Sequence, residues 1–355
     1  MNKRNFMYPM ALLIPLLAVL AGPPSAKTDE PAAVTQATAI SPASGVAGTE
    51  LPSHRIPNLG EAAEWYFAPN GRFLIGNAKG PGDTVHHVYI ASPDGRDIRR
   101  INGQGEDACS YFFPDGKRVL WTSTRDWPDL PKGNWSDAND YPQGAEIYSS
   151  DTRGGHVARL TTNKVYDAEC VVAPDGRWIL FGRQVDGKMD LWTMAADGSN
   201  QKQITFTDDW QEGGAQVLPD SETIITRAWL RQDQGKGRGM MPMQIFTLKR
   251  DGSGRRQITT DEGTHWAPYP APDSRHFVYV RVLTEPNGRP NWEIYLRNIE
   301  TGHEQRLTYD PAFDGFPSIS ADGRWMTFSS GRGGKPGERA LFQHIMDISS
   351  LGLGK

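Results

Sequence analysis

The chain has 355 residues, with 38 glycines, 26 prolines and a formal charge of -4 at pH 7. A chain of this size buries roughly three-quarters of its unfolded surface on folding, so its core needs neither a metal nor a disulfide framework. The sequence contains no basic run with interleaved aromatic residues, no Cys-x-x-Cys and no His-Glu-x-x-His. Composition and motifs therefore argue against a nucleic-acid-binding protein and against a zinc enzyme.

Residues 1–26 have the pattern of a secretory signal. Two cations precede an apolar stretch from Met10 to Leu20, which is too short to span a bilayer comfortably. Small residues follow and offer cleavage sites that end at Ala21 or Ala26. Because no cysteine lies near the end of the apolar stretch, a lipoprotein signal is excluded. We expect a cleaved signal peptide and a periplasmic or secreted mature protein that does not span the membrane.

Residues 27–53 are rich in Ala, Pro, Ser and Thr and show no periodicity. This composition is typical of a flexible leader. The remaining residues, 54–355, are expected to form one folded domain.

One short phrase recurs six times in that domain, at spacings of 45 to 60 residues. Its copies are Phe67-Ala-Pro-Asn-Gly71, Phe112-Phe-Pro-Asp-Gly116, Val172-Ala-Pro-Asp-Gly176, Val217-Leu-Pro-Asp-Ser221, Pro270-Ala-Pro-Asp-Ser274 and Ile319-Ser-Ala-Asp-Gly323. Each phrase is followed by two alternating apolar runs, a tight turn and, in most copies, a closing Leu-Thr or Ile-Thr strand. Each unit is therefore predicted to be a four-stranded antiparallel meander. Several such sheets around an axis make an all-β fold, a six-bladed β-propeller.

The two ends of the domain complement each other. The sixth unit stops before any Leu-Thr strand, and His54-Arg55-Ile56 precedes the first unit at the spacing expected for that strand. The segment from His54 to Leu59 is thus predicted to complete the last blade and close the ring. An open solenoid would need polar capping repeats at both ends, and none is visible.

Cys109 and Cys170 are the only cysteines. They lie one position out of register in the first strands of consecutive blades. An oxidising compartment would permit a disulfide. We favour two buried thiols, because strand alternation points the two side chains to opposite faces.

The repeat resembles that of the TolB-type β-propellers. The resemblance is carried by Phe-Pro-Asp-Gly-Lys-Arg-Val-Leu-Trp-Thr-Ser-Thr-Arg125, Glu146-Ile-Tyr148, Asp190-Leu-Trp-Thr-Met-Ala-Ala-Asp-Gly-Ser-Asn200 and Arg306-Leu-Thr308. It covers the chain from His54 onward and implies a TolB-like propeller. TolB carries an α/β domain ahead of its propeller, where this chain has a signal and a leader. The resemblance therefore implies a stand-alone propeller, to which the Tol-Pal role in envelope integrity does not transfer intact.

A ring of polar residues is predicted at one mouth of the central tunnel. Counting eight residues back from the repeat aspartate gives Asp107, Asp167, Glu212, His265 and Asp314, with Ala62 in the first blade. Such a ring could bind a cation or a basic peptide. The structural alternative is that these groups pair between neighbouring blades with the arginines that end the second strands, which are Arg125, Arg183, Arg227, Arg281 and Arg332.

Two long insertions are expected on the same face. Asp126 to Gly144 contains Trp127, Trp135 and Tyr141, and Leu230 to Pro242 is rich in cations and methionine. Long loops on a compact scaffold are often functional, and rigid aromatic side chains suit recognition of sugars or peptides. The alternative is that each loop packs onto its own blade. The spacing of the aspartates does not match a calcium loop.

Two classes of function follow. The first is a non-enzymatic, exported and monomeric propeller that binds a protein, peptide or cell-envelope partner on its acidic tunnel face and uses no cofactor. The second is an enzyme that acts on a carbohydrate or lactone, with ring carboxylates and His265 supplying acid-base chemistry, either with or without calcium. The sequence lacks a Gly-x-Ser-x-Gly motif and a histidine-rich metal set, which favours the first.

Overall fold

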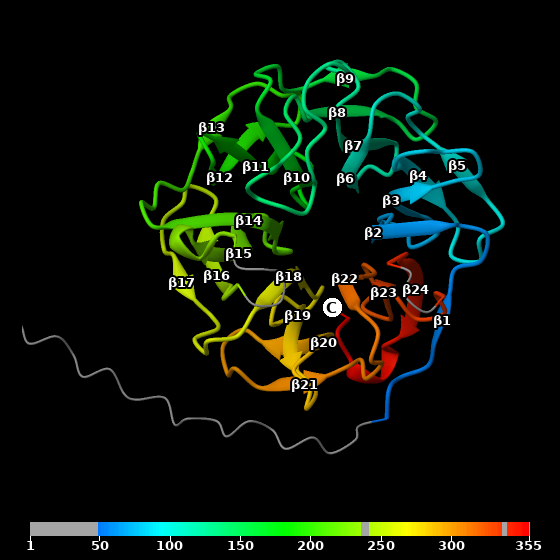
Figure 1. Cartoon of the computed structure of the whole chain (residues 1–355), viewed down its shortest axis with the longest axis vertical. Helices are drawn as coiled ribbons and strands as arrows, with labels where there is room; N and C mark the ends of the chain where they lie inside the picture. Colours follow the sequence, from blue (N-terminus) through cyan, green and yellow to red (C-terminus); the bar gives the residue numbers. More distant parts are fainter. Residues whose placement is uncertain (1–48, 236–240, 336–338, 355) are drawn as a thin grey trace, which may run out of the picture. The chain divides into compact units, whose positions relative to one another are not determined.

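The structure is a computed structural model that describes residues 49–235, 241–335 and 339–354. The predicted signal peptide and most of the predicted leader lie outside these residues. The described part forms six four-stranded antiparallel sheets, so the predicted fold is confirmed. Figure 1 shows the sheets arranged around a central opening, with the first strand of each blade innermost.

The strands of blades one to three follow one another along the chain. Blade one comprises β2 (Glu61–Phe67), β3 (Leu74–Lys79), β4 (His87–Ala91) and β5 (Ile98–Arg100). Blade two comprises β6 (Asp107–Phe112), β7 (Arg118–Ser123), β8 (Glu146–Asp151) and β9 (Ala158–Arg159). Blade three comprises β10 (Tyr166–Val172), β11 (Trp178–Val185), β12 (Lys188–Ala195) and β13 (Lys202–Gln203).

The other three blades repeat this order until the ring closes. Blade four comprises β14 (Trp210–Val217), β15 (Thr223–Leu230), β16 (Gln244–Lys249) and β17 (Arg256–Gln257). Blade five comprises β18 (His265–Pro270), β19 (His276–Thr284), β20 (Pro290–Asn298) and β21 (Glu304–Arg306). Blade six comprises β22 (Asp314–Ile319), β23 (Trp325–Ser330), β24 (Phe342–Asp347) and β1 (Ser53–Arg55). The helical segments among the described residues are two 3-10 turns, η1 (Arg231–Asp233) and η2 (Ser349–Leu351).

The ring is closed by its first strand, as predicted. β1 pairs antiparallel with β24, with Ser53 opposite Met346, and the Ile56 N–H donates to the Gln343 carbonyl at 2.8 Å. The strand is shorter than predicted because it ends at Arg55. The segment beyond it still contributes to the core, since Ile56 and Leu59 are buried in one cluster with residues of blades one and six.

The threonine of the recurring Leu-Thr or Ile-Thr pair holds the outer strand against the third strand of its blade. The threonine hydroxyl accepts the backbone N–H of the neighbouring third strand, where an outer strand of only two or three residues provides few backbone bonds. The four pairs, at 2.8–2.9 Å, are Thr161 with Ile147, Thr205 with Leu191, Thr259 with Ile245 and Thr308 with Ile294. In blade one Asn102 stands at this position, and the Val88 N–H is accepted instead by Asp107 of the next blade at 3.0 Å.

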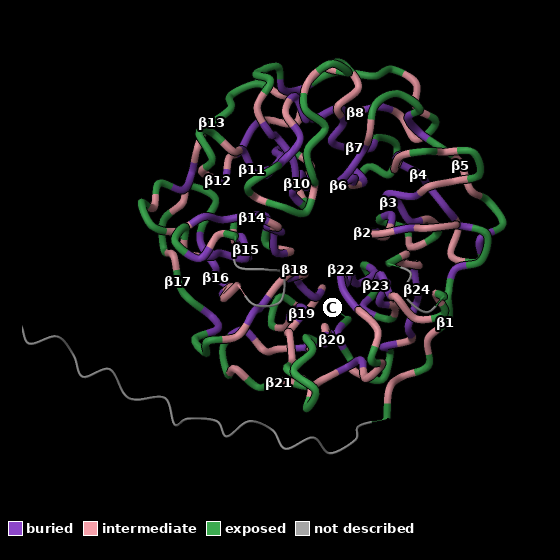
Figure 2. Tube along the Cα trace, in the orientation of Figure 1, coloured by how far each residue is buried: buried purple, intermediate pink, exposed green. Residues whose placement is uncertain are grey.

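The core lies between blades. Each neighbouring pair of blades shares one cluster of buried apolar side chains, and a further cluster lies beneath the loops of blades two to four. Figure 2 shows the same division, with buried segments in the inner and middle strands and exposed segments in the outer turns. None of the described residues belongs to a helix with the length and apolarity needed to cross a bilayer.

Candidate functional site

Each of the six inner strands contains a β-bulge at the same place. The register between the first and second strands of the blade shifts there, next to the residue that lies six positions before the repeat Asp or Asn. A bulge inserts an extra residue and re-aims its side chain. The six bulge residues all have a left-handed backbone, with φ between 48° and 58°: Glu64, Cys109, Glu169, Gly214, Ala267 and Phe316. Bulky side chains are rare in this conformation, and such strain clusters at functional sites.

All six bulge residues line one central cavity of about 1050 Å³. We call this cavity the funnel. Its other walls come from the beginnings of the inner strands and from loops between second and third strands, which include 134–141, 234–235 and 339–341. The funnel therefore opens on the face where the inner strands begin. The predicted insertions lie on that face.

Three tyrosines meet across the central tunnel, and two of them, Tyr66 and Tyr269, line the funnel. Tyr66, Tyr111 and Tyr269 lie four residues before the repeat Asn or Asp of blades one, two and five. The ring centroids of Tyr66 lie 5.1 Å from Tyr111 and 5.9 Å from Tyr269, and the hydroxyls of Tyr111 and Tyr269 are 3.3 Å apart. Because blades two and five are opposite in a ring of six, this contact crosses the tunnel. A ligand would therefore enter from the open face.

Two bulge residues are acidic, and they have different partners. Glu169 is paired across the blade boundary, with Arg227 Nη2 2.8 Å from its Oε1 and the Gly214 N–H donating to its Oε2 at 2.6 Å. The Arg227 side chain is itself buried. This pair joins blades three and four at the wall of the funnel.

Glu64 has a much poorer set of partners. The Tyr66 hydroxyl donates to its Oε1 at 3.0 Å, and no cation among the described residues lies within ion-pair distance of it. Burial raises the pKa of Glu64 to about 7. The charge of Glu169 contributes to this rise, whereas the Tyr66 hydroxyl, the Cys109 side chain and the charge of Arg227 oppose it. Glu64 is thus a carboxyl group that the surrounding protein leaves poorly stabilised in its charged form.

Blades five and six provide an aromatic wall. Its members are Trp266, Trp292, Phe313 and Phe316, all half-buried and all lining the funnel. The Trp266 ring lies 4.5 Å from Phe316 and 5.7 Å from Trp292, both edge to face, and Trp292 lies 5.6 Å from Phe313. The rings hold one another in place, so they present a preformed apolar surface to a ligand.

The three predicted loop aromatics have different positions. Trp135 and Tyr141 line the funnel, and Tyr141 is buried against Tyr166 with stacked rings 4.0 Å apart. Trp127 does not line the funnel. The Lys164 ammonium nitrogen lies over its ring, 4.2 Å from the ring centroid. The tip of this insertion therefore forms part of the funnel, whereas its base is structural.

The insertion between β7 and β8 reaches across two blades. Its Ala138 carbonyl accepts the side-chain amides of Gln184 in blade three at 2.8 Å and of Gln234 in blade four at 3.2 Å. The loop thus does not pack on its own blade alone, and it builds one side of the mouth. Of the second insertion, residues 236–240 lie outside the described residues.

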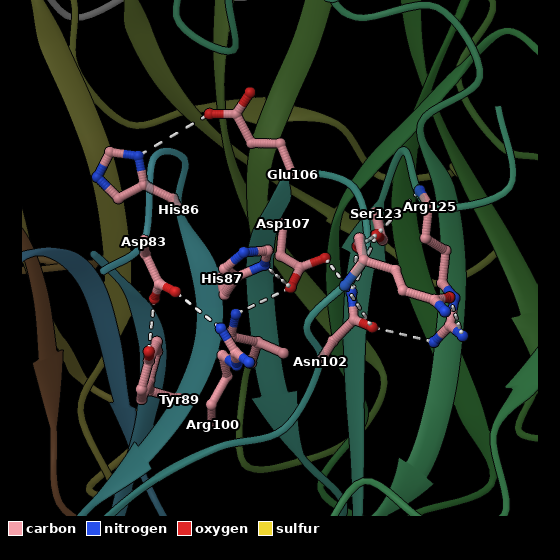
Figure 3. Close-up of polar contacts among 12 residues, drawn as sticks. Asp83, His86, His87, Tyr89, Arg100, Asn102, Glu106, Asp107, Ser123 and Arg125 are labelled. Atoms are coloured by element: carbon pink, nitrogen blue, oxygen red, sulfur yellow. Dashed lines mark hydrogen bonds and ion pairs between the residues drawn. The ribbon is translucent and has the colours of Figure 1, made fainter. Parts of the chain in front are cut away.

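The residues of the predicted polar ring are buried inside the protein and do not stand exposed at the mouth of the tunnel. Asp107 is buried, although it touches the funnel wall, and Figure 3 shows its carboxylate among blade-one groups. It accepts the Val88 N–H at 3.0 Å and the Asn102 amide at 2.7 Å, and the His87 Nδ1 lies 3.5 Å away. Arg125 reaches Asp107 only through Asn102, whose Oδ1 accepts from its guanidinium at 3.1 Å.

Asp167 and Asp314 pair with strand-end arginines. The Arg183 guanidinium donates to both oxygens of Asp167 at 2.6 and 2.8 Å, and Arg332 donates to Asp314. Both pairs lie within one blade, not between blades as the structural alternative supposed. Burial raises the pKa of Asp314 to about 6 in spite of Arg332.

Glu212 and His265 are also engaged inside the protein. The Glu212 Oε1 lies 3.2 Å from Arg255 Nη2, and burial raises the pKa of this carboxyl group. The His265 Nε2 lies 3.1 Å from Asp261 Oδ1, while its Nδ1 lies 3.1 Å from the Met243 carbonyl of blade four. All five ring residues have side chains 0–1% exposed. A binding role for them stays a prediction, and their geometry favours the structural role.

The described residues contain no group of three or more His, Cys, Asp or Glu side chains that could hold a metal ion. Cys109 and Cys170 are free and buried, in agreement with the predicted thiols, and burial raises the pKa of both. Neither thiol has the lowered pKa of a nucleophile.

Sequence reasoning missed the bulge residues. Plain alternation along a strand predicts which side chains share a face, and the bulge breaks that alternation once in every blade. One feature of the sequence could have identified them. The position six residues before the repeat Asp or Asn is occupied by a glutamate twice, by a cysteine once and by a phenylalanine once.

No protein-family model matches the chain. A protein of Agrobacterium fabrum (strain C58), named uncharacterized protein Atu1656, is 26% identical over an alignment of 264 residues, and the match covers 64% of this chain and 87% of that protein.

Solved structures share the architecture. A protein assigned as TolB from Agrobacterium tumefaciens matches with a TM-score of 0.57 and 19% identity, over 85% of this chain and 99% of that one. TolB from Acinetobacter baumannii matches with a TM-score of 0.55 and 18% identity, over 86% of this chain and 66% of that one. Oligogalacturonate lyase from Vibrio parahaemolyticus matches with a TM-score of 0.52 and 12% identity, over 85% and 95%. In fold, the protein is a TolB-like six-bladed β-propeller.

Proposed function

We propose that this protein is an exported, monomeric binding propeller that takes a segment of a protein or peptide partner of the cell envelope into its funnel. The observation that carries the proposal is the funnel itself, whose wall includes Tyr269, the residue that contacts Tyr111 across the tunnel. Its volume of about 1050 Å³ is at the upper end of ordinary ligand sites. A segment several residues long would fit, with the aromatic wall as its apolar contact.

A binding role is supported over a catalytic one by the state of the titratable groups. Glu169 is held by Arg227, and His265 is buried with both ring nitrogens close to partners. A general acid-base pair needs groups that are free to exchange protons with a substrate, and these two are already engaged by partners. The catalytic alternative relied on His265 and the ring carboxylates, whose buried side chains give it no support.

Export is proposed from the sequence of residues 1–26 alone. The cationic start and short apolar stretch would direct secretion, and the folded domain would then act outside the cytoplasm. Mass spectrometry of the mature protein tests this, with an N-terminus expected between Gly22 and Lys27. A soluble form that retains Met1 in the cytoplasm would contradict it.

Affinity capture from envelope extract tests the binding role. The wild-type protein is compared with a Phe313→Ala/Phe316→Ala variant, which removes two rings of the aromatic wall. The matched control is Phe206→Ala, which removes a ring that is 68% exposed outside the funnel. We expect a defined partner to be retained by the wild type and the control and lost from the double variant. Equal recovery by all three would overturn the proposal.

A further inference from the structure

We propose that the funnel receives a cationic side chain, lysine or arginine, from the partner segment, with Glu64 as its counterion and Phe316 beside it. The inference rests on the proposed function, because it names the chemistry of the group that the funnel takes. It is carried by one carboxylate of the funnel wall that has no ion pair with any cation of the described residues.

The pairing pattern of the funnel sets Glu64 apart. Glu169 has Arg227, and Asp107 has Asn102 and the Val88 N–H. Glu64 receives a hydrogen bond from the Tyr66 hydroxyl and no ion pair from the described residues. The Glu64 side chain is half-buried, and a carboxylate withdrawn from water is costly unless a cation or several hydrogen-bond donors compensate it. A cation supplied by a ligand would complete this site.

The place of Glu64 in the ring fits such a ligand. Blade six precedes blade one around the ring, so Phe316 and Glu64 are neighbouring bulge residues. The blades touch here, since the Glu64 N–H donates to Ser329 Oγ at 3.0 Å and Ser318 Oγ donates to the Trp65 carbonyl at 2.9 Å. A cation on Glu64 would therefore lie at the edge of the aromatic wall, where the ring faces attract positive charge.

A small residue stands beside the aromatic wall. Ala267, the bulge residue of blade five, lines the funnel next to Trp266, whereas the space at Gly214 of blade four is filled by the Arg227 guanidinium, which lies where a Cβ would stand. The stem of a lysine or arginine would therefore lie along Ala267 and the rings of Trp266 and Phe316. Long cationic side chains bury such stems along apolar surface and keep the charged head on a polar group.

The charge state of Glu64 gives the proposal a distinct signature. The groups that face it are Tyr66 on its own strand, Cys109 of β6, Glu169 of β10 and Arg227 of β15. Burial raises the pKa of Glu64 to about 7 in the free protein, so part of the population is protonated at neutral pH. A bound cation favours the charged form, and binding at pH 7 should therefore release protons.

The probes are blocked pentapeptides of the form Gly-Gly-X-Gly-Gly, with X as lysine, arginine, norleucine or glutamate. Binding is measured by calorimetry at pH 7 in two buffers of different ionisation enthalpy. We expect the lysine and arginine peptides to bind at least tenfold more tightly than the norleucine peptide, and the glutamate peptide not to bind. The heat should differ between buffers in proportion to the proton released.

Glu64→Gln is the decisive variant, and Glu300→Gln, an exposed carboxylate outside the funnel, is its matched control. The first should lose at least tenfold in affinity for the cationic peptides and lose the buffer dependence, and the control should change neither. Norleucine binding as tightly as lysine, unchanged affinity in Glu64→Gln, or no binding of cationic peptides up to about 10 mM would each overturn the inference. Partner capture that depends on Phe313 and Phe316 but not on Glu64 would leave the proposed function standing.

Discussion

The last residue of the turn that follows each inner strand has a left-handed backbone in all six blades. Four copies use glycine there, at Gly71, Gly116, Gly176 and Gly323, and two use Ser221 and Ser274. Its N–H donates to the carbonyl three residues earlier, and the preceding Asp or Asn accepts a backbone N–H two residues further on. The repeated phrase is therefore a turn requirement, not a catalytic motif.

The serine copies allow a stability test. Ser274→Gly should stabilise the protein by about 0.5–1 kcal/mol. The change removes the cost of about 1–2 kcal/mol that a left-handed backbone imposes on a non-glycine residue, and the greater conformational freedom of glycine in the unfolded chain offsets part of this gain. Gly176→Ser is the reverse change and should destabilise by a similar amount, since an added Cβ meets nothing closer than 3.7 Å there. Denaturant melts measure both. The two changes in the free energy of unfolding should have opposite signs. Destabilisation of both variants would contradict the backbone explanation of the turn.

Glu64 offers a pH test in the unliganded protein. The pKa of Glu64 is about 7 in the folded protein and 4.5 ordinarily. The protonated group therefore contributes its full share to the free energy of unfolding below about pH 4.5, and this contribution is lost as the pH rises through 7. Glu64→Gln should therefore leave stability at pH 4.5 nearly unchanged and increase it at pH 8 by about 1–2 kcal/mol, less than the about 3 kcal/mol of a fully buried group. Denaturant melts at the two pH values check it, and a variant destabilised at both would show that Glu64 is structural.

At the scale of elements, the strands were predictable and the bulges were not. Turn phrases and apolar alternation placed the strands of every blade, because both patterns depend on neighbours in sequence. The identity of the funnel wall depends on an extra residue in each inner strand, which apolar alternation alone does not reveal. Asp107 shows the same limit, since its role depends on Asn102 replacing a threonine in the previous blade.

The segment that closes the ring is expected to contribute strongly to the stability of the propeller, and this contribution can be measured. Ile56 is 1% exposed between blades six and one, and Ile56→Ala should destabilise by about 2–5 kcal/mol. His54→Ala, an exposed position on the same segment, should change stability by less than about 0.5 kcal/mol. Chemical melts compare the two. A chain that begins at Gly60 should melt lower than one that begins at Thr49, and equal melting temperatures would contradict closure by this strand.

At the scale of the whole molecule, the propeller has two unlike faces. One carries the short turns of the repeated phrase, and the other carries the long loops, the aromatic wall and the open end of the funnel. The bridge of tyrosines separates them. Binding is therefore expected on one face only, with the bulge residues at its deepest point.

Photo-crosslinking in envelope extract tests this claim most directly. A photoreactive residue is placed at Asn139, an exposed loop position on the funnel wall, or at Lys117, an exposed turn position on the opposite face. The account predicts one defined crosslinked partner from position 139, lost when Phe313→Ala/Phe316→Ala is introduced, and none from position 117. A partner crosslinked from position 117, or one at position 139 that persists in the double variant, would contradict it.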